Sequence, residues 1–522
     1  NVAETSITIP DVGFVVDGAR VKEERYDPQR HMASLDDVYV SRSSAKQRRG
    51  RAGRVRDGLA VHLVPRVAIE RAGDPQNAGG APVLETHAQP EVRRVALDQL
   101  VLRLKALPEG VVPGRTAADA CAALPEPPEP DAVRRAANQL VAIGALERRE
   151  EEADERLTDL GAVLARLPID AKMGKLCVLG CLFDGCLDAA LTIAAALGNR
   201  SPFLSPLERR EEADASKKAF CRTDAGPSHC GKSDLLCIRN AYDAYEMQGQ
   251  HKYNFARDRF LGIKTLQQIG NLKRQLLEAL AQAGLAPGLP RTLRARDLEY
   301  EGRSMGDTDG VRAALQRFRR SQPPPPPSDA ALAALVAAAL FPQVAHVHAP
   351  PSKKTKAPCN PENVKLHVRD PDGQAAEPQA AQVHPSSVRG RLTGAGWVSP
   401  YACFHEKVRT TKVYVRDATP VPPLAPYLLT GNRLDVDDDS ETLTLDGWLT
   451  LVAPGGAALV AEFREKVDAR ISDLLGGKAP LDSDAQALLS CLETLCAQES
   501  SALPDRLKQQ VLAHGGGGGG GE

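Results

Sequence analysis

The chain has 522 residues, which is room for roughly three or four domains of about 100–200 residues each. Its 42% hydrophobic and 25% charged residues are ordinary for a globular protein, and no uncharged apolar run reaches the about 18–20 residues that a membrane span needs. The net charge of −1 argues against a generally basic protein, so a nucleic-acid contact would have to be local.

Eleven cysteines in a chain of this length do not indicate a disulfide scaffold. Cys177, Cys181 and Cys186 lie in an apolar helical run and indicate buried thiols in a reducing compartment. The spacings of Cys221, His229, Cys230 and Cys237 match no zinc ribbon or finger, so no metal site is predicted. We expect a cytoplasmic protein, with the nucleus as the alternative, and a monomer.

Residues 1–70 alternate strand and helix patterns. The β-like runs are "VGFVV" (12–16), "LDDVYV" (35–40) and "LAVHLV" (59–64). A short helical segment within "SRSSAKQRRGRAGR" (41–54) stands before the last of them, with Ser44 and Gln47 at the spacing of a capping box. Buried strands around a helix predict part of a parallel α/β sheet.

The middle of the chain is predicted to be helical. Two amphipathic helices, around "LDQLVLRLKAL" and "AVRRAANQLVAIGAL", are expected in 85–156, and a helical bundle in 157–285. Residues 286–329 predict a linker, because they contain the polyproline stretch "SQPPPPPSD". Within 330–475, short β-like runs predict a small β-barrel closed by the helix "LVAEFREKVDARISDLL". Residues 476–522 are expected to be a tail with a disordered glycine run.

The stretch "GPSHCGKS" (226–233) matches the phosphate-loop pattern letter for letter. No apolar strand precedes it, and Pro227 removes the first loop amide that could face a phosphate. Ser233 and Asp234 are instead favoured residues for the start of a helix. The match is therefore interpreted as a chance resemblance, and the reading as a working nucleotide site remains the minor alternative.

A second basic segment, "QRRGRAGR" (47–54), places several arginines around two glycines. It fits a solvated or RNA-contacting face, and equally a phosphate-facing loop in which guanidinium groups neutralise a transferred phosphoryl.

The segment does not stand alone. Together with "NVAETSITIPDVGFVVD", it resembles motifs V and VI of the DEAH/RHA group of superfamily 2 ATP-dependent RNA helicases. The resemblance continues in the family's order through "PEVRR", "LTDLGAVLARLPID", "SPFLSPLERREEAD", "HPSSV" and "FHEKVRTTKVYVRD", over roughly residues 1–475, and is most similar to the multidomain RHA-like branch. It implies part of a second RecA-like lobe (1–70), a winged-helix domain (85–156), a ratchet domain (157–285) and an oligonucleotide-binding (OB) fold (330–475).

The resemblance also implies functional residues. Arg51 and Arg54 would be arginine fingers toward the γ-phosphate of ATP bound with Mg²⁺, and Gln47 would orient the attacking water. Further nucleotide contacts would come from Ser6, Asp11, Gly50 and Gly53. Between the two motifs, "GARVKEERYDPQRHMASLDD" matches the place of a strand-separating β-hairpin. The residues implied to contact RNA, mainly single-stranded, are Asn1, Glu4, His384, Ser386, Thr410, Thr411, Lys412 and Arg416.

The phosphate loop and the Asp-Glu magnesium site of a first lobe are missing from the sequence, as is the motif V threonine that would precede Asn1. We therefore expect the C-terminal portion of an ATP-dependent RNA helicase, inactive by itself and open to activating protein partners. The alternative is a non-catalytic module that binds single-stranded RNA or a partner protein.

Overall fold

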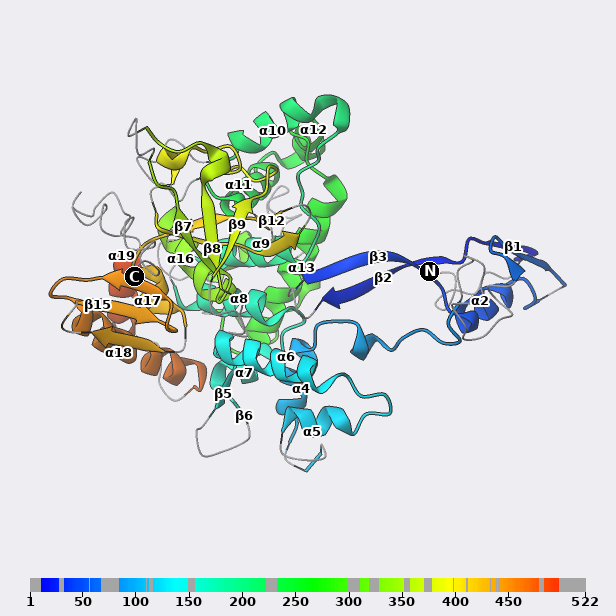
Figure 1. The fold of residues 1–522 in the computed structure, drawn as a ribbon, viewed down its shortest axis with the longest axis horizontal. Coiled ribbons are helices and arrows are strands. Elements are labelled where there is room, and N and C mark those ends of the chain that lie inside the picture. Colours follow the sequence, from blue (N-terminus) through cyan, green and yellow to red (C-terminus); the bar gives the residue numbers. More distant parts are fainter. Residues whose placement is uncertain are drawn as a thin grey trace, which may run out of the picture. The chain divides into compact units, whose positions relative to one another are not determined.

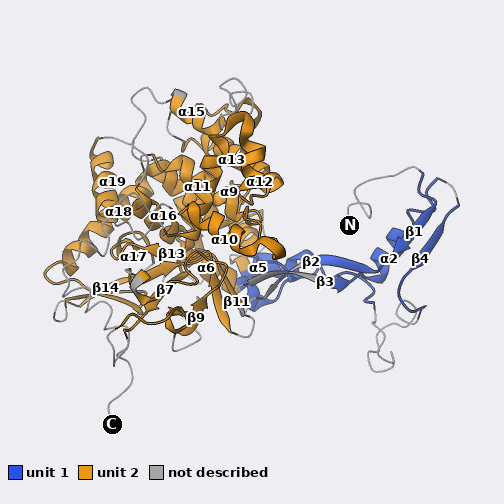
Figure 2. Ribbon diagram, turned by 90° about the horizontal axis from the view of Figure 1, so that it is seen from above, with its two compact units in different colours: residues 1–97, 118–133 blue, residues 98–117, 134–522 orange. Residues whose placement is uncertain are grey.

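The computed structural model describes only some stretches of the chain. They are residues 11–27, 32–55, 57–66, 84–108, 110–111, 116–148, 155–183, 185–221, 232–286, 288–298, 310–318, 328–351, 357–369, 378–397, 399–409, 412–431, 433–437, 439, 441–477 and 483–496. The chain divides into two compact units, residues 1–97 with 118–133 and residues 98–117 with 134–522 (Figure 2).

The first unit contains a parallel strand pair and a hairpin. Strands β1 (Phe14–Asp17) and β4 (Leu59–His62) pair in parallel, and helix α2 (Arg42–Arg49) connects β3 to β4 and packs against both strands of the pair. Strands β2 (Arg20–Asp27) and β3 (Met32–Tyr39) form an antiparallel hairpin over eight register pairs, in the region predicted to hold one.

The expectation of buried strands is wrong for β1 and β4. Phe14 and Val16 are 78% and 70% exposed, and Leu59 and Val61 are 56% and 43% exposed. These side chains alternate to one face of a two-stranded sheet, since successive residues of a strand point to opposite sides. Nothing in the described part of this unit covers that face.

Short helices and a small hairpin occupy the region predicted as a winged helix. They are α4 (Asp98–Lys105), α5 (Ala117–Ala122) and α6 (Pro130–Ile143), followed by the antiparallel pair β5 (Leu146–Arg148) and β6 (Glu155–Leu157). Helix α6 ends at Ile143 and is followed by Gly144, whose φ of +85° is the left-handed conformation that favours glycine after a helix end.

The helical bundle follows as predicted. Its helices are α7 (Asp159–Leu164), α8 (Ala171–Leu182), α9 (Leu187–Leu197), α10 (Arg210–Ala219), α11 (Asp234–Glu246), α12 (Lys252–Asp258) and α13 (Ile263–Gln282). Helix α9 lies among the other helices of the bundle (Figure 1), where it packs against α8, α11 and α13. Almost all of its residues are buried. Cys177, Cys181 and Cys186 are buried here as free thiols, in agreement with the sequence.

The interval 286–329 is not simply a linker. It contains helix α15 (Gly310–Phe318), which packs against α9 and α13 and buries Val311, Ala313 and Ala314. Arg312 on this helix forms ion pairs with Asp188 on α9, at 3.0 Å, and with Asp243 on α11. The polyproline residues 321–327 lie outside the described part of the chain.

Helix α16 (Asp329–Leu340) is the centre of the C-terminal half, and every one of its residues is buried. Its sequence, DAALAALVAAAL, is apolar on all sides, as expected of a helix enclosed by other elements. It packs against helices α8 and α17 (Ala425–Leu429) and against strands β10 (Tyr401–Cys403) and β13 (Thr419–Val421).

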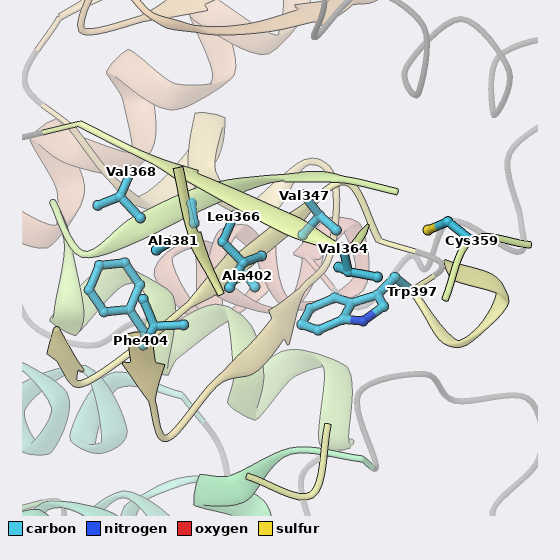
Figure 3. Close-up of a cluster of buried hydrophobic side chains, with 11 residues drawn as sticks. Val347, Cys359, Val364, Leu366, Val368, Ala381, Trp397, Ala402 and Phe404 are labelled. Carbon is cyan, nitrogen blue, oxygen red and sulfur yellow. The ribbon is translucent and has the colours of Figure 1, made fainter. Parts of the chain in front are cut away.

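The strands after α16 form a seven-stranded sheet in the order β11-β12-β9-β8-β7-β10-β13. The members not yet bounded are β7 (Val344–His348), β8 (Lys365–Val368), β9 (Gln379–Val383), β11 (Glu406–Arg409) and β12 (Val413–Arg416). Neighbouring strands are antiparallel except β9 and β12, which pair in parallel. Their side chains surround a core that includes Leu366, Trp397 and Phe404 (Figure 3).

A smaller sheet and two helices complete the second unit. Strands β14 (Leu434–Asp437), β15 (Thr442–Leu445) and β16 (Leu449–Val452) form an antiparallel sheet, followed by α18 (Ala457–Leu475). The predicted tail is wrong over 483–496, because helix α19 (Ser483–Cys496) buries Ala485, Leu489, Leu492 and Cys496 against the preceding helices. The glycine run lies outside the described residues, and no described helix is long and apolar enough to cross a membrane.

We predict that Asp188→Asn destabilises the bundle by about 3–5 kcal/mol, because it removes the negative charge that lies 2.8 Å from the fully buried Lys273 ammonium and 3.0 Å from the Arg312 guanidinium. Chemical denaturation followed by circular dichroism measures this loss. The matched control is Glu462→Gln in the exposed Glu462–Lys466 pair of α18, which should leave the free energy of unfolding nearly unchanged, because solvent screens an exposed ion pair. Equal effects of the two substitutions would contradict the prediction.

Candidate nucleic-acid interface

The site begins at the carboxyl end of β9. Because β9 and β12 run in parallel with Val383 opposite Val415, the chain leaving β9 at His384 lies beside Tyr414 and Arg416. The backbone N–H of His384 donates to the Val415 carbonyl at 2.9 Å, and the two rings of His384 and Tyr414 meet edge to face at 5.7 Å. Two predicted RNA-contacting residues, His384 and Arg416, are thus brought together.

The loop 384–390 after β9 is held by one buried carboxylate. Asp234, 1% exposed at the start of α11, accepts hydrogen bonds from the Lys217 ammonium at 2.9 Å, the Ser387 hydroxyl and the Val388 N–H at 3.0 Å. Lys217 also donates to the Ser386 carbonyl at 2.9 Å. Helices α10 and α11 and this loop therefore share one charge cluster.

Arg389 fixes the other end of the loop. Its guanidinium donates to the carbonyls of Lys232 and Gly396, at 2.9 and 2.8 Å, and stacks over the Trp397 ring at 4.1 Å. Since Arg389 is 1% exposed, these contacts replace the water that a buried guanidinium loses. The loop is consequently anchored both to the bundle and to the core of the seven-stranded sheet.

His384 is held neutral on this surface. Burial lowers the pKa of its imidazole below the usual value, and the positive charges of Arg416 and Arg210 lower it further. Its Nδ1 accepts from the Ser386 N–H at 3.2 Å and lies 2.7 Å from the Ser386 hydroxyl, so the ring proton belongs on Nε2. The ring therefore presents an Nε2–H donor beside these cations, while the Asp234 carboxylate acts in the opposite direction and raises the pKa.

The structure describes some of the residues predicted to contact RNA at this surface, and others lie outside the described part of the chain. Ser386 and Lys412 are exposed, and Arg416 is half-buried with a Glu406 carboxylate 3.6 Å away. Thr410 and Thr411 lie outside the described residues. The sequence patterns missed Arg210, Lys217 and Tyr414, which join the surface only because α10 and β12 converge on loop 384–390.

The basic segment of the first unit separates its arginines into different roles. Arg48 on α2 donates to the Asp17 carboxylate at 2.8 Å, and His62 lies 3.1 Å from the same carboxylate. Burial raises the pKa of Asp17, but hydrogen bonds from Arg48 and the Ala19 N–H outweigh this and lower it. Arg48 therefore fastens α2 to strand β1 rather than pointing outward.

The predicted fingers lie after this helix. Arg51 is half-buried, whereas Arg54 and Gln47 are exposed. A side chain at Gly53 would meet open space, while one at Gly50 would meet only ordinary contacts, so a ligand could approach this backbone closely. Asp11 is exposed; Asn1, Glu4 and Ser6 lie outside the described residues. The helix begins three residues earlier than the Ser44–Gln47 pattern predicts, because Ser41 is the residue that caps it.

The phosphate-loop pattern ends in a helix start, as interpreted from the sequence. The Ser233 hydroxyl accepts from the Leu236 N–H at 3.1 Å and lies 2.7 Å from the Thr419 hydroxyl. Residues 226–231 lie outside the described residues. The Ser233 hydroxyl is buried and already has two hydrogen-bond partners, so it is not available to coordinate a magnesium ion. In the described part of the chain, no group of three or more His, Cys, Asp or Glu side chains could bind a metal.

Three family models match the second unit. They are the winged-helix part of the helicase-associated domain (HA2) at residues 136–169, its ratchet-like part at 170–238 and the oligonucleotide/oligosaccharide-binding (OB) fold at 332–432. The matched ratchet and OB segments contain Asp234 and Ser387, so the shared charge cluster joins two recognised domains.

Long relatives align with most of the chain. Human DHX57 is 36% identical over 91% of this chain and 32% of its own length. Human ATP-dependent DNA/RNA helicase DHX36 is 31% identical over 97% of this chain and 44% of its own length, and human ATP-dependent RNA helicase DHX29 is 32% identical over 88% and 29%. The chain thus spans between 29% and 44% of the length of these relatives.

We predict that Asp234→Asn destabilises the second unit by about 3 kcal/mol, because one amide oxygen cannot replace a carboxylate that accepts from three donors. Hydrogen exchange of residues 384–390 should accelerate in the same variant. Asp435→Asn, in the exposed pair with Arg433, is the control and should change stability by less than about 1 kcal/mol. Unchanged exchange in the loop would refute the anchoring role.

We also predict that Lys232→Ala leaves the response of this chain to ATP and magnesium unaltered, because Ser233 is occupied as a helix cap. Isothermal titration calorimetry of both proteins measures this. ATP binding that is present in the parent chain and lost in Lys232→Ala would instead establish the "GPSHCGKS" segment as a nucleotide site.

Proposed function

The chain carries the C-terminal helicase-associated and OB-fold domains of the DEAH/RHA-type superfamily 2 helicases, and we propose that it supplies the RNA-binding region of an ATP-dependent RNA helicase. The observation that carries the proposal is the junction of ratchet and OB domains at loop 384–390. This junction gathers cations, a neutral imidazole and an aromatic ring on one surface.

The surface is chemically suited to single-stranded RNA. Arg210, Lys412 and Arg416 would neutralise backbone phosphates without reading the base sequence. The Nε2–H of His384 would donate to phosphate or ribose oxygens, and the Ser386 hydroxyl oxygen, whose proton faces Nδ1 of His384, would accept from a ribose hydroxyl. Tyr414 offers a ring against which a base could stack, as in other OB-fold surfaces.

The first unit would serve the ATP-dependent step. Arg51 and Arg54 would contact the γ-phosphate of ATP, whose hydrolysis supplies the free energy for translocation and unwinding, with Gln47 orienting water and Gly50 and Gly53 allowing close approach. Arg48, in contrast, would only hold α2 in place through Asp17. Magnesium would be bound by residues other than those described here, since these contain no suitable cluster.

We predict that the chain binds single-stranded RNA with an affinity that falls with salt, and that Arg210→Gln and Arg416→Gln each weaken binding several-fold on any sequence. Each should also reduce the magnitude of the salt slope by about 0.7, the value per phosphate contact for single strands. Fluorescence anisotropy with a labelled homopolymer, repeated at several salt concentrations, measures both quantities.

Lys466→Gln is the matched control, because Lys466 is an exposed cation on α18 already paired with Glu462. Equal weakening by this control, or salt-independent binding, would contradict the assignment of the surface. RNA-stimulated ATP hydrolysis by the longest natural form of this protein supports the helicase role, whereas RNA binding without it in that form supports a non-catalytic RNA-binding module.

A further inference from the structure

Two cysteines face each other beside the anchored loop. Cys221 follows the end of α10, and Cys237 lies in the first turn of α11. Their Sγ atoms are 2.6 Å apart, only slightly longer than the roughly 2.03–2.05 Å of a disulfide bond. Both are free thiols, packed with Phe203, Phe220 and Val388. Bond formation therefore requires little movement of either helix.

The two thiols are not equivalent. Cys237 is completely buried, whereas Cys221 keeps 9% of its surface exposed. The hydrogen bond between the thiols lowers the pKa of Cys221; burial and the Asp234 carboxylate act against it, and the charges of Lys217 and Arg389 add to the lowering. The same bond, together with burial, raises the pKa of Cys237. Since Cys221 is the more exposed thiol and its pKa is the one that is lowered, it is the thiol that an oxidant meets first.

We propose that Cys221 and Cys237 form a redox-active dithiol that a small hydroperoxide oxidises to an intramolecular disulfide. The Cys221 thiolate attacks the peroxide, so that an S–O bond forms, the O–O bond breaks and, with hydrogen peroxide, one water leaves after protonation. Cys237 then attacks the Cys221 sulfenic acid; an S–S bond forms, the S–O bond breaks, and the hydroxide leaves as water with the Cys237 proton. Two thiols lose two electrons, and one hydrogen peroxide becomes two waters.

The bridge would join the segment that follows α10 to the first turn of α11, close in sequence to the Asp234 cluster. Lys217 and Asp234, which hold loop 384–390, are four residues before Cys221 and three before Cys237 on the same helical segments. Oxidation would thus reinforce, by a covalent link, the arrangement that the ion pair already favours. The proposal does not depend on RNA binding or on ATP hydrolysis.

Trypsin makes the bond simple to identify. Cleavage after Lys and Arg releases Cys221 in the peptide AFCR (219–222) and Cys237 in SDLLCIR (233–239), each with a single cysteine, while the intervening peptide carries Cys230. After treatment of the folded chain with hydrogen peroxide and alkylation of remaining thiols, non-reducing mass spectrometry should find AFCR joined to SDLLCIR. The joined peptide should weigh two hydrogens less than the sum of its parts and separate on reduction with dithiothreitol.

Variants define the order of the steps. In Cys237→Ser, oxidation should stop at a sulfenic acid on AFCR, trapped by dimedone, whereas Cys221→Ser should give neither adduct nor bridge at this site. Cys491→Ser, which removes an exposed cysteine on α19, should retain the bridge in full. Thermal unfolding by circular dichroism confirms that each variant is folded.

The result from the unmodified sequence decides the proposal even where a variant fails to fold. A bridge from Cys230 to either partner, or peroxide consumption that leaves both peptides unlinked, would overturn it. The joined AFCR–SDLLCIR peptide, formed in the folded chain and absent when the chain is oxidised in denaturant, would establish it.

Discussion

A buried carboxylate at the first residue of α11 organises the second unit. Asp234 is almost fully removed from water, and a charge in that position is stable only when donors replace the lost hydration. It obtains them from α10, through Lys217, and from the loop after β9, through Ser387 and Val388. Satisfying one anion therefore fixes the bundle, the sheet and the connecting loop with respect to one another.

The proposed RNA surface is a consequence of that constraint. With the loop fixed, His384 lies beside β12, and the cations of α10 and β12 act on the same imidazole, as the lowering of its pKa by Arg416 and Arg210 indicates. Repulsion among these positive charges is reduced because the Lys217 ammonium forms an ion pair with the Asp234 carboxylate. The close approach of Cys221 and Cys237 arises from the same packing of α10 against the first turn of α11.

In the first unit, the arginines of the basic segment 47–54 occupy two different environments. Arg48 is consumed in an ion pair that ties α2 to β1, whereas Arg54, beyond the helix end, is exposed. Two glycines in or next to this segment differ in the same way. A side chain at Gly58 would lie 2.2 Å from the Ala52 carbonyl oxygen, so this glycine is needed for packing, whereas Gly53 faces open space. Identical residue types in one short segment thus occupy either packed or exposed positions.

The sequence by itself determined what short-range chemistry encodes. Apolar periodicity predicted the helices of 157–285, turn-bounded β-like runs predicted strands in 360–452, and Ser233 with Asp234 predicted a helix start that the structure confirms. Ordered motifs indicated the helicase-associated and OB-fold domains that the family models match. Each of these signals lies within a few consecutive turns or strands.

Tertiary structure decided the rest, because it depends on residues far apart in the chain. Helix α16 is apolar on every side and gives no amphipathic period, so only its enclosure by sheet and helices reveals its central role. Helix α15 stands before the polyproline run and α19 before the glycine run, so the sequence around them reads as linker or tail. The burial of these helices depends on residues far away in the chain, such as Asp188, which pairs with Arg312 on α15. The Asp234 cluster joins residues more than 150 positions apart, and no local pattern encodes that pairing.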